Sequence, residues 1–450
     1  MMNIRSYIKT YNYDNGDLQR VQVASFDKWE DLRFIRPKSP QRAFDDLCRL
    51  YTDFFMDQVK PIVGHLIMFR LPDDMDVPFP MENKKYGKIC DRLAAVAVAF
   101  RKNIYGDSRG IHFRNSETED FYNRLKEAGC LKTAKGKWNH ITLMPVGNEL
   151  GYLSDMALDH KLLVNSNFFV FMHMECVSVY DRVGMPIGLC IDNGRIINPP
   201  MFRREALMVY EDGLTQIEYP DIRDIEIEAA GTIYKHGKNA CIYMRPETKR
   251  TPSGGTDIVV VENRVVAIKE KGGVTIPAGG YVIKTDKVPE GFLQAEKNVR
   301  YHGFEHVKFA IQVGNSAVID GKPVYEFRSD FHKLLKLWKP LYPPATYPLG
   351  YDTDRAPRIA LGADAGGGPV LIWFEGAGKF GYKPGEDSCG ATLKEVADIC
   401  CKEGLVNAVN LDGGGSAQII LNGNRQLKIS DRDKGSLEET ERPIPMGLCI

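Results

Sequence analysis

The sequence predicts an α+β protein: a main domain that is mostly antiparallel sheet with few helices, preceded by an α-rich N-terminal segment. Through the first 130 residues, apolar side chains recur at helical spacing. Beyond about residue 131, short β-branched runs alternate with turn dipeptides, which is typical of hairpins. A chain of 450 residues, 43% of them hydrophobic, has room for two to three domains. We therefore divide it into residues 1–130, whose role the sequence does not indicate, and residues 131–450.

Three helices are expected in the N-terminal segment. Apolar side chains follow one face over residues 42–59, and a second helix fits residues 89–104. The third begins with a capping box, Ser116 with Glu119 three residues later. It ends at Gly129, because a left-handed glycine commonly terminates a helix.

The main domain is expected to consist of strands joined by tight turns. Four dipeptides between extended runs favour type I′ turns: Asn193-Gly194, Asp212-Gly213, Asp320-Gly321 and Asn422-Gly423. The run Gly366–Gly368 lacks the phosphate-loop pattern and a following helix, so we interpret it as a hairpin turn. One helix interrupts the strands, over Thr392–Glu403. Thr392 and Glu395 form its capping box and Gly404 ends it.

Charge and composition exclude several classes of protein. Lys and Arg number 59 and Asp and Glu number 59, so no basic surplus is present to neutralise a nucleic-acid backbone, and we expect no nucleic-acid partner. No window approaches 18 uncharged apolar residues, which predicts no membrane span, and the first residues lack the apolar core of a signal peptide. The ten cysteines show no zinc spacing. We expect a cytoplasmic protein.

The most informative segment is Val406–Gly423, in which an apolar run breaks into three glycines and then resumes as a strand. Three glycines between strands lose packing and conformational entropy, which indicates that something needs the bare backbone. One interpretation is that a ligand approaches the amides of Gly413–Gly415, with Asp412 and Ser416 in the same cleft. The alternative is a glycine-rich turn with a solvated aspartate.

Two further segments could bind a ligand. Asn165-Ser166-Asn167-Phe168-Phe169 places amides beside aromatic rings, a combination that can bind sugar hydroxyls and the apolar face of a sugar, although amides at a strand end are also common turn formers. Arg358 follows a proline at the start of a strand, and its guanidinium could pair two oxygens of a phosphate. A structural ion pair is the alternative for Arg358.

Taken in order, these segments resemble the phosphodiester glycosidase family over about residues 139–450. The resemblance rests on seven stretches: residues 162–169, 192–200, 206–213, 253–268 with 274–283, 309–322, 356–364 and 390–423. The last of them, ending in VNLDGGGSAQIILNG, is the most specific.

The resemblance implies a hydrolase that cleaves the bond between a sugar's anomeric carbon and phosphate in a carbohydrate phosphodiester. It implies Asp412 and Arg358 as catalytic residues. Asp412 would activate water or stabilise the oxocarbenium-like centre, or could instead bind a divalent cation, and Arg358 would clamp the phosphate. The implied substrate-binding residues are Asn165, Phe168, Asn410, Gly413, Gly414, Gly415 and Ser416.

The sequence departs from the family pattern at several positions that line the implied pocket. Ser166 and Asn167 replace two glycines, residues 314–317 (Gly-Asn-Ser-Ala) replace Gly-Gly-Gly-Pro, and Glu375 stands where the family has Asp. These changes put the substrate in doubt more than the reaction. Two alternatives therefore stay open: a glycosidase or transglycosidase acting on a phosphate-free glycan, and a non-catalytic carbohydrate-binding protein.

Overall fold

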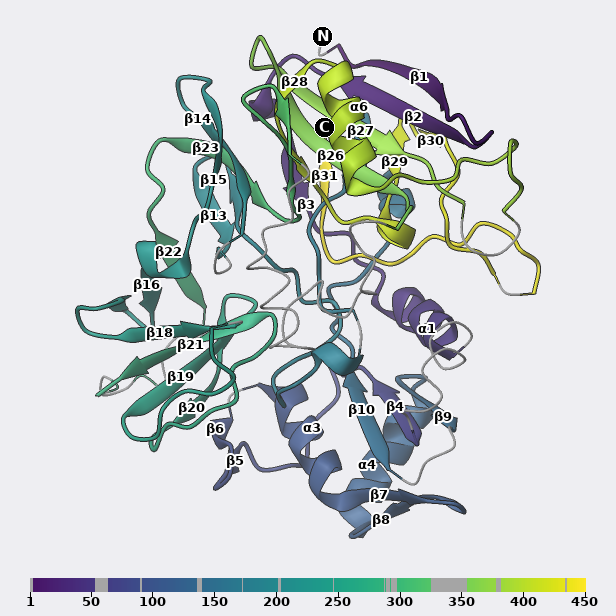
Figure 1. The fold of residues 1–450 in the computed structure, drawn as a ribbon. Helices are drawn as coiled ribbons and strands as arrows, with labels where there is room; N and C mark the ends of the chain where they lie inside the picture. The colour runs from purple at the N-terminus through teal and green to yellow at the C-terminus, as the bar shows by residue number, and fades with distance from the viewer. Residues whose placement is uncertain are drawn as a thin grey trace.

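The computed structural model describes residues 3–52, 64–89, 91–135, 140–171, 173–200, 204–245, 247–286, 288, 292, 298–324, 354–377, 382–433 and 435–450 (Figure 1). Its strands form sheets in which nearly all neighbours are antiparallel, while β4 and β10 pair in parallel. No helix in these ranges is long and apolar enough to cross a membrane.

The largest sheet brings the two ends of the sequence together. In spatial order it contains β1 (Arg5–Asn12), β2 (Leu18–Ser25), β27 (Pro369–Phe374), β26 (Arg358–Asp364), β28 (Leu405–Asn410), β24 (Ser316–Ile319) and β25 (Lys322–Pro323). A neighbouring sheet contains β3 (Arg33–Ile35), β31 (Gly447–Cys449), β11 (Leu162–Asn165), β29 (Ile419–Leu421) and β30 (Asn424–Arg425). These two sheets carry the segments predicted to form the site.

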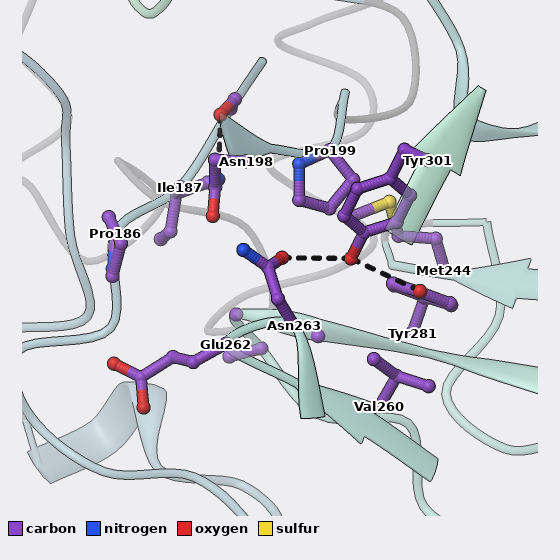
Figure 2. A pocket seen from close by; sticks show the side chains of 14 residues that line it. Pro186, Ile187, Asn198, Pro199, Met244, Val260, Glu262, Asn263, Tyr281 and Tyr301 are labelled. Atoms are coloured by element: carbon purple, nitrogen blue, oxygen red, sulfur yellow. Dashed lines mark hydrogen bonds between the residues drawn. The ribbon is translucent and has the colours of Figure 1, made fainter. Parts of the chain in front are cut away.

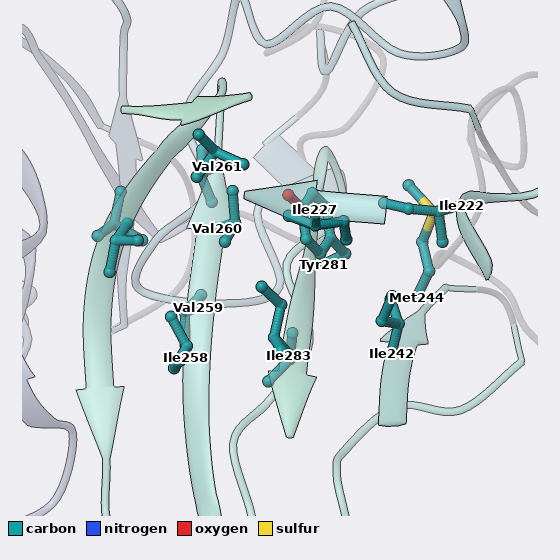
Figure 3. Packing of buried hydrophobic residues seen from close by; sticks show 14 of the residues in the cluster. Ile222, Ile227, Ile242, Met244, Ile258, Val259, Val260, Val261, Tyr281 and Ile283 are labelled. Carbon is teal, nitrogen blue, oxygen red and sulfur yellow. The ribbon is translucent and has the colours of Figure 1, made fainter. Parts of the chain in front are cut away.

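The middle of the chain, together with β5 and β6, forms three further sheets. The first contains β13 (Arg195–Asn198), β12 (Cys190–Asp192), β23 (Val307–Gln312), β14 (Ala206–Tyr210) and β15 (Thr215–Glu218), and the second β17 (Thr232–Lys235), β16 (Glu226–Ala229) and β22 (Val299–His302). The third contains β18 (Cys241–Met244), β21 (Gly280–Thr285), β19 (Thr256–Val261), β20 (Arg264–Lys269), β6 (Gly87–Ile89) and β5 (Glu82–Asn83). Their facing β-branched side chains pack into one buried core, shown around Ile227, Ile258 and Ile283 in Figure 3.

The remaining elements lie together at one end of the molecule or cover a sheet. They are β10 (Ile141–Pro145), β4 (His65–Phe69), β9 (Leu131–Lys135), β7 (Ile104–Asp107), β8 (Gly110–Phe113) and the helices α1 (Pro40–Leu50), α3 (Arg92–Asn103), α4 (Ser116–Glu127) and α6 (Leu393–Lys402). In Figure 1, α6 lies over the largest sheet.

The predicted fold class is wrong. The described part of the chain is mostly β, and no α-rich segment precedes it, because the chain begins with the hairpin of β1 and β2. The first 130 residues also pair with later strands: β2 with β27, β3 with β31 and β6 with β20. Among these early strands, β1 is almost entirely exposed and β3 and β6 are only three residues long, so the helical periodicity over residues 42–127 dominated the interpretation. A domain boundary near residue 130 stays a prediction.

Individual helices were predicted better than the fold class. Helix α6 begins with the predicted capping box of Thr392 and Glu395. In α4 the cap is instead Asn115, whose side chain accepts from the Thr118 N–H, so the Ser116 capping box is wrong. Helix α1 matches the first part of the helix predicted over residues 42–59, and residues 53–59 lie outside the described part.

The predicted turns are mostly confirmed. Both residues have positive φ at Asn193-Gly194, Asp320-Gly321 and Asn422-Gly423, whereas at Asp212-Gly213 only the glycine does. Residues 366–368 join β26 to β27 as a hairpin turn, in which the Asp364 carboxylate accepts from two glycine N–H groups.

Candidate active site

The glycine signature forms a short loop beside the start of β26. The chain leaves β28 at Asn410 and runs along residues 357–359, with the Leu411 N–H donating to the Ile359 carbonyl at 2.7 Å and the Gly414 N–H to the Pro357 carbonyl at 2.9 Å. It makes one 3-10 turn over Gly414–Ser416 and enters β29. The loop that carries Asp412 therefore lies next to Arg358, although the two residues are far apart in sequence.

Asp412 is a buried carboxyl at the start of this loop. Its side chain accepts from the Gly413 N–H at 2.9 Å, and its own N–H donates to the Ser166 carbonyl at 3.0 Å. Burial raises the pKa of Asp412 from the ordinary 3.8 to about 7, although Ser416 and Arg442 act to lower it. A buried carboxyl with a pKa near neutrality is typical of a functional site.

A different physical constraint favours glycine at each position of the signature. A Cβ on Gly413 would lie 2.8 Å from the Pro357 carbonyl oxygen, and one on Gly415 would lie 2.2 Å from the Asp431 carboxylate. Gly414 has a φ of +60°, which favours glycine, and a Cβ there would have no neighbour within 4 Å. Packing inside the protein explains two of the three glycines, so these two do not require a bound ligand.

Asn165 fastens this loop to the neighbouring sheet. It ends β11, and its side-chain Nδ2 donates to the Asp412 carbonyl at 2.6 Å while its Oδ1 accepts from the Gln418 N–H at 3.0 Å. The side chain of Asn165 thus bridges the two ends of the glycine loop. It positions Asp412 through the backbone.

Phe168 and Asn410 are also buried beside the loop. The Phe168 ring belongs to a hydrophobic core, and the Arg204 guanidinium lies over it, 5.5 Å from the ring centre. Asn410 pairs with Ala360 across the sheet, and its carbonyl accepts from the Gly314 N–H at 2.9 Å. The structure therefore brings these predicted residues together around Asp412.

Arg358 is buried, and its guanidinium binds the backbone. Nε donates to the Ala391 carbonyl at 3.2 Å and Nη2 to the Asp354 carbonyl at 3.1 Å. Its Cδ lies 3.6 Å from the position a Cβ would take on Gly413, which places the arginine directly against the loop. These bonds hold Arg358 in place at the base of the loop.

Three charged residues near Asp412 were missed. Arg442 donates to both carboxylate oxygens of Asp431, at 2.9 and 3.0 Å, and this ion pair packs against Gly415. Glu175 is buried, accepts from the Phe171 N–H at 2.7 Å and acts to raise the pKa of Asp412. No motif marks them: Asp431 and Arg442 come from loops, and Glu175 ends the short 3-10 helix η4 (His173–Glu175).

Three residues that depart from the family pattern, Ser166, Asn167 and Glu375, are buried and contact other parts of the protein. The Ser166 carbonyl accepts from Asp412, and its buried hydroxyl has no hydrogen-bond partner among the described residues. Asn167 donates to the Ile187 carbonyl at 3.2 Å. Glu375 is buried and paired with Arg20 at 3.0 Å, while Ser388 donates to it at 2.6 Å. Glu375 therefore anchors the start of the chain to the largest sheet.

A separate pocket is lined by residues from the stretches 192–200 and 253–268, which resemble the family pattern (Figure 2). Asn198, Asn263 and Tyr301 line it, and Tyr301 donates to Asn263 Oδ1 at 2.8 Å. It connects to the loop region through Ile187, another lining residue, whose N–H donates to the Phe168 carbonyl at 2.8 Å. Within the described ranges, no group of three or more His, Cys, Asp or Glu side chains is arranged to hold a metal ion.

Part of this chain is similar to known proteins. The bovine and human proteins named N-acetylglucosamine-1-phosphodiester alpha-N-acetylglucosaminidase are each 33% identical to this chain over 93 residues, which is 21% of this chain and 16% of each relative. The match therefore covers a small part of those proteins.

Two solved structures align over nearly the whole chain at low similarity. The catalytic domain of the zebrafish protein of that name, auto-inhibited by its pro-peptide, has 12% identity and a TM-score of 0.40, covering 100% of this chain and 83% of that chain. A hypothetical protein from Synechocystis has 14% identity and a TM-score of 0.42, covering 99% and 61%. Scores this low support no further inference.

The profile of the phosphodiester glycosidase family matches residues 248–450, which include Arg358, Asn410 and the whole glycine loop. The resemblance inferred from the motifs is thus confirmed, and residues 248–450 carry the sequence pattern of the phosphodiester glycosidase family.

Proposed function

We propose that this protein is a hydrolase that cleaves the bond between the anomeric carbon of a sugar and phosphate in a sugar-1-phosphodiester. The observation that carries the proposal is Asp412, a buried carboxyl in the glycine signature whose pKa is raised to about 7. A general base is most effective when its pKa lies near the working pH. Asp412 is therefore suited to accept a proton at neutral pH.

The reaction needs one proton acceptor and stabilisation of charge. Water attacks the anomeric carbon and gives its proton to Asp412 as the bond from that carbon to the phosphate oxygen breaks. The phosphomonoester leaves with the electron pair as a stable anion, so a strong general acid is less necessary than in ordinary glycoside hydrolysis. Arg442 favours the charged form of Asp412 and would keep part of it ionised before the reaction.

Arg358 is the proposed contact for the phosphate. A guanidinium has five N–H donors in a planar fork, and it can bind backbone carbonyls and an anion together. The position of Arg358 against Gly413 would put a phosphate within reach of the Asp412 loop. Ser416, whose hydroxyl acts on the pKa of Asp412, would orient the carboxyl.

A hydrolase acting on a phosphate-free glycoside is the second candidate. It is favoured by the bonds from Arg358 to the carbonyls of Ala391 and Asp354, since an arginine used to hold backbone groups need not bind phosphate. In that case Asp412 keeps its role and Arg358 is structural. The two candidates differ in the group that leaves and in the role of Arg358.

The test is a screen of sugar-1-phosphodiesters and matched aryl glycosides, with released sugar measured for the wild type and Asp412→Asn. We expect release from a phosphodiester, a fall in kcat of about 10²-fold or more in the variant, and lower wild-type rates as the pH falls below about 7. Asp14→Asn, at an exposed position in the first hairpin, is the matched control and should keep full activity.

Other outcomes would contradict the proposal. Release from aryl glycosides alone would favour the second candidate. Binding of a sugar phosphate with no release from either substrate would mean a non-catalytic carbohydrate-binding protein. Full activity in folded Asp412→Asn would remove Asp412 from the mechanism.

A further inference from the structure

A second cleft lies beside the pocket of Figure 2 and is strongly basic. The two share Glu262, Asn263 and Tyr301. Five arginines and two glutamates line the cleft, an excess of three formal positive charges. The arginines are Arg36, Arg182, Arg195, Arg264 and Arg300. The whole chain has a formal net charge of zero, so the positive excess of this cleft is balanced by negative charge elsewhere in the chain.

Both glutamates of the cleft already have cationic partners. Glu262 accepts from Arg182 Nε at 2.6 Å, and both side chains are largely buried. Glu149 lies 3.2 Å from the ammonium group of Lys38. Neither glutamate of the cleft is therefore paired with Arg195 or Arg264 among the described residues.

Hydrogen bonds around Asn263 fix the walls of the cleft. The Asn263 side chain donates to the Ile197 carbonyl at 2.7 Å, and its backbone carbonyl accepts from the Val299 N–H at 2.8 Å. Asn263 therefore joins β13, β20 and β22 at one point. The arginines of these strands are close to it in sequence: Arg195 is two residues before Ile197, Arg264 follows Asn263, and Arg300 follows Val299.

Such an arrangement favours a ligand with several negative charges. A cleft lined by one sign of charge focuses the electrostatic field and attracts counter-ions. Guanidinium groups pair phosphate oxygens bidentately. Because the arginines come from three separate strands and two loops, a chain of linked phosphates can contact more of them than a single phosphate can.

We propose that this cleft is a binding site for an oligophosphate, a ligand carrying two or more linked phosphate groups. Arg195 and Arg264, both exposed on the walls, bind the phosphates, and Asn263 holds their strands in place. The site is separate from Asp412 and independent of the proposed hydrolase activity.

The experiment measures binding of inorganic tripolyphosphate by isothermal titration calorimetry at low and moderate salt. The full-length wild type should bind tripolyphosphate more tightly than inorganic phosphate, and added salt should weaken binding, because the contacts are between exposed charges. The double variant Arg195→Gln/Arg264→Gln should bind about tenfold or more weakly. Since both side chains are exposed, its unfolding temperature should match that of the wild type.

The control removes the same charge elsewhere. Arg5→Gln/Lys28→Gln changes two exposed cations outside the cleft and should bind tripolyphosphate as the wild type does. An equal loss in this control would reduce the effect to overall charge and overturn the proposal. So would unchanged binding in the cleft variant, equal affinity for phosphate and tripolyphosphate, or no binding by the wild type. Because turnover is not measured, none of these outcomes bears on Asp412.

Discussion

Two buried carboxylates in this molecule, Asp412 and Glu262, differ in how their charge is balanced. Each follows a buried strand, Glu262 directly after β19 and Asp412 two residues after β28. Glu262 forms an ion pair with Arg182, whereas Asp412 forms no ion pair among the described residues and has a pKa raised to about 7. A carboxylate in an ion pair of this kind holds two segments of the structure together. An unpaired one can exchange a proton, which is what a reaction requires.

The largest effect on stability is expected when the ion-pair partner of Glu262 is removed. Arg182→Ala leaves a largely buried carboxylate without its cation, and we expect a loss of about 3–5 kcal/mol in the free energy of unfolding. Urea unfolding at pH 7 measures it. Arg109→Ala removes one partner of an exposed ion pair with Asp107 and should lose far less stability. A loss of the same small size in Arg182→Ala would mean that Glu262 is not a structural ion pair.

The pH dependence of stability tests whether the pKa of Asp412 is raised. Its folded pKa of about 7 lies above the unfolded value near 4, so its contribution to stability is full at low pH and is lost as the pH rises through 7. Asp412→Asn lacks this dependence. From pH 5 to pH 8 the variant should gain on the order of 3 kcal/mol relative to the wild type, measured by urea unfolding. Parallel curves for the two proteins would contradict the raised pKa.

Several residues that lie around Asp412 could be singled out from the sequence, whereas the fold class could not be predicted. Asp412, Asn165 and Arg358 each belong to a motif at a strand end, and the fold places them side by side. Arg442 and Asp431 could not be found, because their pairing depends on how a loop folds against Gly415. The fold class failed because β2 and β27 pair across most of the chain, and local periodicity carries no signal for such distant pairing.

A substitution at Arg358 tests whether it resembles Arg182 or serves the reaction. Arg358→Lys keeps the charge but loses the planar fork. We expect a loss of roughly 1.5–3 kcal/mol in kcat/KM for a sugar-1-phosphodiester and much less for an aryl glycoside of the same sugar. Steady-state kinetics on both substrates measures this. Equal losses, or none, would assign Arg358 a structural role only.

The smallest expected effect concerns the loop that presents Asp412. Gly414→Ala places a side chain at positive φ without a clash, and we expect a loss of about 1 kcal/mol in stability. Gly404→Ala, at the end of α6, also has positive φ and open space, and is the matched control for stability. Equal stability losses with lower activity only in Gly414→Ala would show that the loop's conformation matters for catalysis. Equal activities would separate the loop backbone from the reaction.

The pairing of β3 with β31 has a consequence for biosynthesis. Arg33 lies opposite Cys449, and β31 also pairs with β11, the strand that ends in Asn165. A ribosome makes β3 and β11 long before β31. Both strands therefore lack β31 as a partner while several hundred residues are added. Contacts this distant in sequence slow folding and expose strand edges to aggregation. We expect the nascent chain to depend on chaperones until β31 has emerged.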